Sequence, residues 1–236
     1  MKLNTNSNIY TFVYMTIVVV IVAVLLSVVS SVLQPLKDKN VLLDKQKQIL
    51  GALKVDSIQG DPAEVYMALA TDTIRFYSEE KNDTCEVYVF DLNGDTKYVL
   101  PLSGKGLWGG IGGYLALNDD KNTIWGVNFN HEGETPGLGA KIVEKEFRAQ
   151  FENTHICNAA NEIVSVAVLK SGKKAEGKEQ VDAISGATIT SEGVSKMLEQ
   201  ELIHNYKEFL QVAKDTVENE VEQIEGKEED HVESED

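Results

Sequence analysis

An uncharged apolar stretch, rich in valine, isoleucine and leucine, occupies residues 10–33. A helix needs about 20 apolar residues to cross the ~30 Å hydrocarbon layer of a bilayer, and this stretch is long enough. The apolar core of a cleaved signal peptide is shorter, about 7–15 residues, and precedes a small-residue cleavage site. We therefore predict an uncleaved, single-pass transmembrane helix over residues 10–33, preceded by a short segment over residues 1–9.

The positive charges do not settle which side of the membrane the rest of the chain occupies. Lys2 precedes the apolar stretch, and four lysines follow it: Lys37, Lys39, Lys45 and Lys47. A charge count places the following residues in the cytoplasm, but long folded domains are translocated largely regardless of charge. The orientation stays open at this point.

The overall charge restricts the partners of the chain. The formal net charge is −16. Because the chain lacks the basic surface that neutralises phosphates, we expect no nucleic-acid partner. Much of the negative charge lies in residues 215–236, which are dominated by Glu and Asp. Such a composition buries little apolar surface, so we expect a disordered, solvated tail, with a binding role as the alternative.

Helical and turn signals organise the residues after the span. Residues 34–55 are predicted to form a juxtamembrane helix or linker, with helical spacing of apolar residues over 41–55. Two β-hairpins are expected, one over 86–102 around Asn93-Gly94 and one over 114–129. Asn-Gly is a strong turn signal, and apolar residues alternate along the second hairpin.

The remaining elements complete an α+β domain. A further strand is expected over 162–169, and an amphipathic helix over 191–213 with Thr190 or Ser191 as its N-cap. Strands in the middle with helices at the two ends are typical of an α+β fold. We predict one domain over 56–214 with a mixed or antiparallel sheet and flanking helices.

A glycine-rich segment over 103–113 separates the two hairpins. It contains a literal GxGxxG at Gly104, Gly106 and Gly109. That pattern binds dinucleotides only where a strand leads into a helix, and here a second strand follows, so we reject a Rossmann site. A glycine-rich loop with Trp108 at its centre favours close approach of the backbone to a flat ligand, and a flexible connector is the alternative.

No metal site is expected. Cys85 and Cys157 are distant and have no CxxC spacing, so one disulfide and two buried thiols are both compatible with the sequence. His131 and Glu132 open a second glycine-rich loop over 131–140, but no HExxH motif or nearby histidine accompanies them. The Gly and Pro content of this loop is typical of a shaped functional loop.

A third segment, over 182–191, reads Asp-Ala-Ile-Ser-Gly-Ala-Thr-Ile-Thr-Ser. Its side chains are too small to fill a core, and glycine weakens any regular element. The segment suits a tight turn at which something bulky reaches one hydroxyl. A Ser/Thr-rich turn that caps the following helix is the alternative.

Together these motifs resemble one family. An N-terminal span, then Gly-Lys-Gly-Leu-Trp-Gly, Gly-Glu-Thr-Pro-Gly-Leu-Gly and Asp-Ala-Ile-Ser-Gly-Ala-Thr in this order, is similar to the C-type subunits of the sodium-translocating NADH:ubiquinone reductase. The G-type subunit of the Rnf electron-transport complex shares the FMN-binding domain and is the alternative. A membrane-anchored binding domain without a cofactor leaves the three motifs unexplained.

The resemblance implies FMN joined through its phosphate to a threonine hydroxyl by a separate flavin transferase. Carried over by position, Thr188 is the acceptor, and Thr190 is the rival hydroxyl. The rest of the acceptor motif is Asp182, Ser185, Gly186 and Ala187. The resemblance also implies that the two glycine-rich loops surround the flavin through these residues: Leu107, Trp108, Glu132, Thr135, Gly137, Leu138 and Gly139.

The family role is to relay electrons within a sodium-pumping NADH:quinone oxidoreductase of six subunits, in which other subunits hold the NADH site and move sodium. The resemblance also implies an inner-membrane location with the FMN domain on the periplasmic side. It thus suggests the orientation that the charge count leaves open.

Overall fold

A computed structural model describes residues 7–55, 60–170 and 172–211. The chain divides into two compact units that meet between Lys45 and Gln46. The predicted tail over 215–236 and the predicted helix end at Ala213 lie outside the described residues. The second unit carries all three motifs.

A single long helix, α1 (Asn8–Ala52), contains both the apolar stretch and the residues after it. The helix continues through Pro35, past the predicted span over residues 10–33. A proline removes one hydrogen bond and bends a helix, and helix-forming residues continue on both sides of it here. By its length and composition, α1 could cross a membrane.

The second unit is built on a five-stranded antiparallel meander in sequence order: β1 (Ala70–Ser78), β2 (Asp83–Leu92), β3 (Asp95–Lys105), β4 (Gly110–Leu117) and β5 (Ile124–His131). Both expected hairpins are confirmed, and β1 is an additional edge strand. At the β2–β3 turn Asn93 and Gly94 have φ values of 60° and 94°, as a type I′ turn requires.

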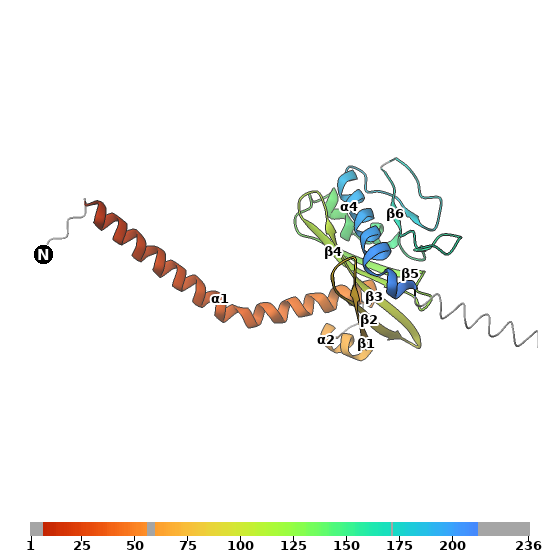
Figure 1. Cartoon of the computed structure of the whole chain (residues 1–236), viewed down its shortest axis with the longest axis horizontal. Helices are drawn as coiled ribbons and strands as arrows, with labels where there is room; N and C mark the ends of the chain where they lie inside the picture. The colour runs from red at the N-terminus through yellow and green to blue at the C-terminus, as the bar shows by residue number, and fades with distance from the viewer. Residues whose placement is uncertain (1–6, 56–59, 171, 212–236) are drawn as a thin grey trace, which may run out of the picture. The chain divides into compact units, whose positions relative to one another are not determined.

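Both faces of this sheet are covered. Cys85 and Val87 of β2 belong to the larger apolar core, together with residues of α4 (Thr188–Glu199). Tyr88 and Phe90 point the other way, into a smaller core formed with residues 49–55 and α2 (Pro62–Leu69). Figure 1 shows α4 and α2 on opposite sides of the sheet. The compact unit that contains this sheet begins at Gln46.

The expected strand over 162–169 is mostly absent from the described structure. Only β6 (Ala167–Val168) forms, pairing in parallel with β7 (Gln180–Val181). Asn161 and Ser165 have φ values of 59° and 65°, which interrupt an extended backbone. The α+β class is confirmed, with parallel pairing limited to this short sheet.

The C-terminal helix begins earlier than predicted, and its predicted end at Ala213 lies outside the described residues. It begins at Thr188 and, after Glu199, continues as the π-helix η2 (Gln200–Asn205). Two short helices follow β5: η1 (Gly139–Val143) and α3 (Lys145–Ala149).

Candidate functional site

The first glycine-rich motif forms the tip of the β3–β4 hairpin. The Gly106 N–H donates to the Gly109 carbonyl oxygen at 2.9 Å, so most of the expected loop is strand. Leu107 and Trp108 stand at the tip with 45% and 68% of their surfaces exposed. A tryptophan this exposed contributes little to the core, so it is available to contact a ligand.

The second motif lies beside this tip. The Glu132 N–H donates to the Gly110 carbonyl oxygen at 3.0 Å, and Glu132 Oε2 accepts from the Gly110 N–H at 3.0 Å. The N–H groups of Leu138 and Ala140 both donate to the Thr135 carbonyl oxygen at 3.1 Å, which closes a tight turn. The turn leaves Leu138 43% exposed.

The third motif forms the turn into α4, and the expected capping residues are wrong. The N-cap is Ala187, which has no side-chain capping bond. Ser191 instead accepts a hydrogen bond at 3.1 Å through its Oγ from the Ile184 N–H, and Thr190 is 1% exposed. Thr188, the first residue of the helix, is exposed.

The Ser191 N–H makes the first hydrogen bond of this helix, to the Ala187 carbonyl oxygen at 2.9 Å. The N–H groups at the start of a helix have no acceptor within it, and they carry the positive end of the helix dipole. With no side chain at the N-cap to satisfy them, these groups are available to an anion beside Thr188.

Glu134 joins the three motifs and was missed from the sequence. It is 4% exposed, and its Oε2 accepts from the Thr190 hydroxyl at 2.6 Å. Its Oε1 accepts from the Trp108 N–H at 3.0 Å. Burial would raise the pKa of this carboxyl, but hydrogen bonds from Thr190, Trp108 and Leu107, with His131 nearby, hold the pKa below its ordinary value. Glu134 is therefore a buried carboxylate.

Two glycines make room for this carboxylate. A side-chain carbon at Gly106 would collide with Glu134 Oε1, and one at Gly139 would collide with Glu134 Oε2 and the Thr190 hydroxyl. These glycines come from different motifs. The lack of a side chain at these two positions leaves room for a polar contact inside the protein.

Leu138 lies close to the acceptor motif. A side-chain carbon placed on Gly186 would lie 3.0 Å from Leu138 Cδ2. Beside Thr188, Ile189 is 56% exposed, an apolar residue that the sequence did not single out. The contacting segments thus expose four apolar side chains near one free hydroxyl: Leu107, Trp108, Leu138 and Ile189.

Two acceptor-motif residues differ in their surroundings. Asp182 Oδ1 accepts from the Ala175 N–H at 2.7 Å, while the Asp182 N–H donates to Gln150 Oε1 at 2.8 Å. These bonds tie the start of the motif to neighbouring loops. Ser185 is exposed, close to the turn at Gly186.

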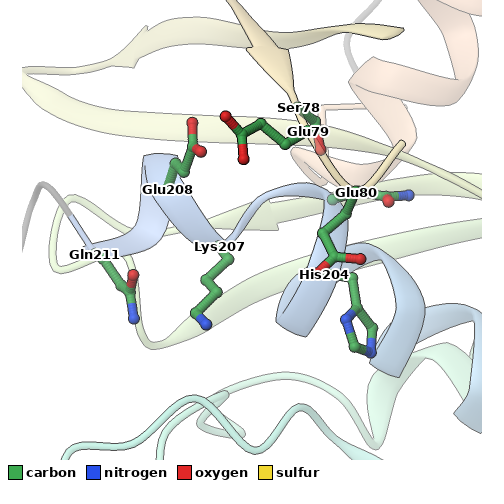
Figure 2. Close-up of a pocket in the computed structure, with 8 residues that line it drawn as sticks. Ser78, Glu79, Glu80, His204, Lys207, Glu208 and Gln211 are labelled. Carbon is green, nitrogen blue, oxygen red and sulfur yellow. The ribbon is translucent and has the colours of Figure 1, made fainter. Parts of the chain in front are cut away.

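A separate cavity of about 560 Å³ lies beside β1 and η2 (Figure 2). Its lining is polar and contains no motif residue: Ser78, Glu79, Glu80, His204, Asn205, Lys207, Glu208 and Gln211. Across residues 7–55, 60–170 and 172–211, no group of three or more His, Cys, Asp or Glu side chains is arranged to hold a metal ion. Cys85 and Cys157 are buried free thiols.

Comparisons with known proteins agree with this arrangement. The profile of the FMN-binding domain matches residues 106–202, from Gly106 within the first motif through the third motif. The C-type subunit of the Na(+)-translocating NADH-quinone reductase from Pasteurella multocida is 38% identical over 137 residues, 57% of this chain and 52% of that protein. The corresponding protein from Haemophilus ducreyi is 37% identical over 111 residues, 46% of this chain and 42% of that protein. The matched segment thus spans about half the length of these relatives.

Solved structures match over a larger share. The crystal structure of the C-type subunit of the Na(+)-translocating NADH-quinone reductase from Parabacteroides distasonis is 36% identical, with a TM-score of 0.70 over 75% of this chain and 96% of that one. NqrC from Shewanella oneidensis has the same fold at 23% identity, with a TM-score of 0.62 over 72% of this chain and 96% of that one.

Proposed function

Because the chain belongs to the NqrC family, the C-type subunits of the Na(+)-translocating NADH-quinone reductase, we propose that it carries FMN as a phosphoester on the Thr188 hydroxyl and relays electrons within that complex. The FMN-binding domain supplies the cofactor class. The names of the relatives favour this complex over the Rnf-type alternative.

The difference in solvent exposure between Thr188 and Thr190 supports Thr188 as the acceptor. Thr188 is exposed at the first position of α4, whereas Thr190 is 1% exposed and its hydroxyl donates a hydrogen bond to Glu134. A transferase must reach the oxygen that it modifies. Thr190 could react only after leaving the core and breaking a 2.6 Å hydrogen bond to a carboxylate.

The residues around Thr188 fit a phosphate diester. The Thr188 oxygen attacks the FMN-side phosphorus of FAD, AMP leaves, and the hydroxyl proton passes to a base of the transferase. The free N–H groups at the start of α4 then face the negative charge of the phosphate. The small residues Gly186 and Ala187 leave space for both the transferase and the product.

The exposed apolar residues at the two loop tips would hold the isoalloxazine ring. Leu107, Trp108 and Leu138 offer flat or branched apolar surfaces, and Thr135 adds a hydroxyl. Glu132, Gly137 and the buried Gly139 complete the residues that we assign to this site. Bound there, FMN would supply the electron-transfer chemistry, and the protein would set its position and surroundings. The tether retains the cofactor even on a surface this open.

Membrane attachment follows from α1, which could cross a bilayer by its length and composition. In this proposal the chain is a single-pass inner-membrane protein with its FMN domain in the periplasm. Its partners are the flavin transferase and the other members of a complex of six subunits.

Peptide mass spectrometry of residues 182–196 tests the proposal, using the full chain produced together with a flavin transferase. We expect the FMN phosphoester mass on Thr188, its complete loss in Thr188→Ala, and its retention in Thr188→Ser, which keeps a hydroxyl. FMN still attached to the Thr188→Ala protein, or found on Thr190, would contradict the assignment.

A further inference from the structure

The two oxygens of the Glu134 carboxylate bind different parts of the chain. Oε1 accepts from the Trp108 N–H at 3.0 Å at the β3–β4 tip, and Oε2 accepts from Thr190 Oγ1 at 2.6 Å in the first turn of α4. The Leu107 N–H is a further donor to the carboxylate. Glu134 thus links two segments that are far apart in the sequence, Leu107–Trp108 and Thr188–Thr190.

The surroundings of this carboxylate are built for it. The side chain is 4% exposed, and its own N–H donates to His131 Nδ1 at 3.3 Å, which fixes the backbone from which it projects. Gly106 and Gly139 leave the space that its two oxygens occupy. A buried carboxylate with strong donors on both oxygens has one favourable position.

The linked segments are two of the three that carry the proposed flavin site; the third is the loop over 132–139, from which Glu134 itself projects. The tip presents Leu107 and Trp108, and the helix start presents Thr188 and Ile189. In Figure 1 the start of α4 lies close to the β3 and β4 ends of the sheet. The Glu134–Thr190 bond lies beneath this surface because both side chains are buried.

We propose that Glu134 and Thr190 are positioning residues that fasten the Leu107–Trp108 tip to the helix start bearing Thr188, so that the wall of the flavin site and its tether keep a fixed spacing. The inference rests on the proposed function for the identity of the ligand. The linkage itself is made entirely by residues of this chain. Thr190, two residues after the acceptor motif, therefore serves to hold the site together, while Thr188 receives the cofactor.

Hydrogen exchange on the full chain without FMN tests the linkage. Thr190→Val keeps the shape of the side chain but removes the donor, and Glu134→Leu removes both acceptors. We expect amide exchange in a peptide covering residues 104–110 to become about tenfold faster in both variants, because the tip loses its anchor. A peptide from β2 serves as the internal control and should not change.

Conservative variants separate a hydrogen-bonded link from general packing. Thr190→Ser keeps the hydroxyl and should exchange like the wild type. Glu134→Gln keeps an oxygen for Trp108 and an N–H group for Thr190 Oγ1 but loses the charge that strengthens both bonds, so its exchange should lie between that of the wild type and that of Glu134→Leu. Thr188→Val is the matched control: it removes the proposed acceptor hydroxyl without touching the link. Unchanged exchange in Thr190→Val, or equally fast exchange in Thr190→Val and Thr190→Ser, would overturn the proposal.

The FMN-loaded protein gives a second, spectroscopic readout. Trp108 held against the flavin would quench flavin emission, so we expect stronger emission from Thr190→Val than from Thr190→Ser at equal FMN content. Equal emission from these two variants would count against a fixed spacing. If the wild type acquires no FMN at all, the proposed function fails, while the exchange experiment still decides whether the link exists.

Discussion

The surroundings of Glu134 predict how the stability of the folded domain changes with pH. Because its hydrogen bonds hold its pKa in the native state below the ordinary value, its stabilisation is present above the unfolded pKa of about 4.3 and is lost as pH falls through the native pKa. The variant Glu134→Gln has no carboxyl to titrate. We expect the wild type to exceed it in unfolding free energy by about 1 kcal/mol more at neutral pH than in acid. Denaturant unfolding over a pH series measures this difference, and a gap independent of pH would contradict it.

For Glu201 in η2 the effect of pH on stability is opposite to that for Glu134. Burial raises its pKa, although hydrogen bonds from Asn205 and the Ser103 N–H and the charge of Lys81 act to lower it. Ionised Glu201 therefore costs stability as pH rises through its native pKa. We expect Glu201→Gln to raise the unfolding free energy at neutral pH by about 1 kcal/mol and to change little in acid.

A neighbouring amide, that of Asn205, adds a second reason to expect that Glu201→Gln is stabilising at neutral pH. Asn205 Oδ1 is buried and has no hydrogen-bond partner among the residues that the structure describes, while Asn205 Nδ2 donates to Glu201 Oε2 at 2.8 Å. The side-chain N–H group introduced by Glu201→Gln can donate to Asn205 Oδ1 once that amide turns over. Thermal unfolding at neutral and acidic pH measures the effect, and a lower Tm at neutral pH would show that the charge is needed.

Different turns of helix α1 differ in whether they contribute to the folded core. Ile49 is fully buried against the sheet in the smaller core, whereas Leu42, two turns earlier, is 55% exposed. We expect Ile49→Ala to lower the unfolding free energy by about 2–5 kcal/mol, because it leaves a cavity in a packed core. Leu42→Ala is the matched control and should leave the unfolding of the domain unchanged. Similar losses in both variants would contradict this division.

The end of this element is also held by polar contacts. Trp125 Nε1 donates to the Leu53 carbonyl oxygen at 3.0 Å, and Lys54 and Lys97 lie over the Trp125 ring at 4.5 and 4.7 Å. Lys54 also pairs with Glu152 at 2.9 Å. The two residues that follow α1, Leu53 and Lys54, thus contact the sheet unit directly.

For the whole molecule, this arrangement predicts where the chain can be shortened. Removing residues 1–45 should release a soluble, folded domain, because the compact unit begins at Gln46. Removing residues 1–55 should lower its Tm or its soluble yield sharply, because the smaller core then loses Ile49, Leu50 and Leu53. Sedimentation with membranes and thermal unfolding measure both outcomes. Equal stability of the two shortened chains would show that the smaller core contributes little.

Local signals predicted the elements that have local causes. The β2–β3 hairpin follows from Asn93-Gly94, whose backbone conformations only a few residues adopt readily. The strand expected over 162–169 was predicted from its apolar residues. A pattern of apolar residues gives no sign of the left-handed backbone conformations at Asn161 and Ser165. Glu134 resembled one more solvated acid in a polar loop, since its donors lie far away in the sequence, at Trp108 and Thr190.

The sequence by itself determined the apolar helix, the antiparallel hairpins, and the three motifs with their order, because these depend on composition and on residues close together along the chain. The tertiary structure alone decided which threonine is exposed and which is buried. It also decided that one carboxylate links the tip at Trp108 to the start of α4. Burial and long-range hydrogen bonds depend on which segments meet in space, and neither Thr188 nor Thr190 carries that information in its neighbours along the chain.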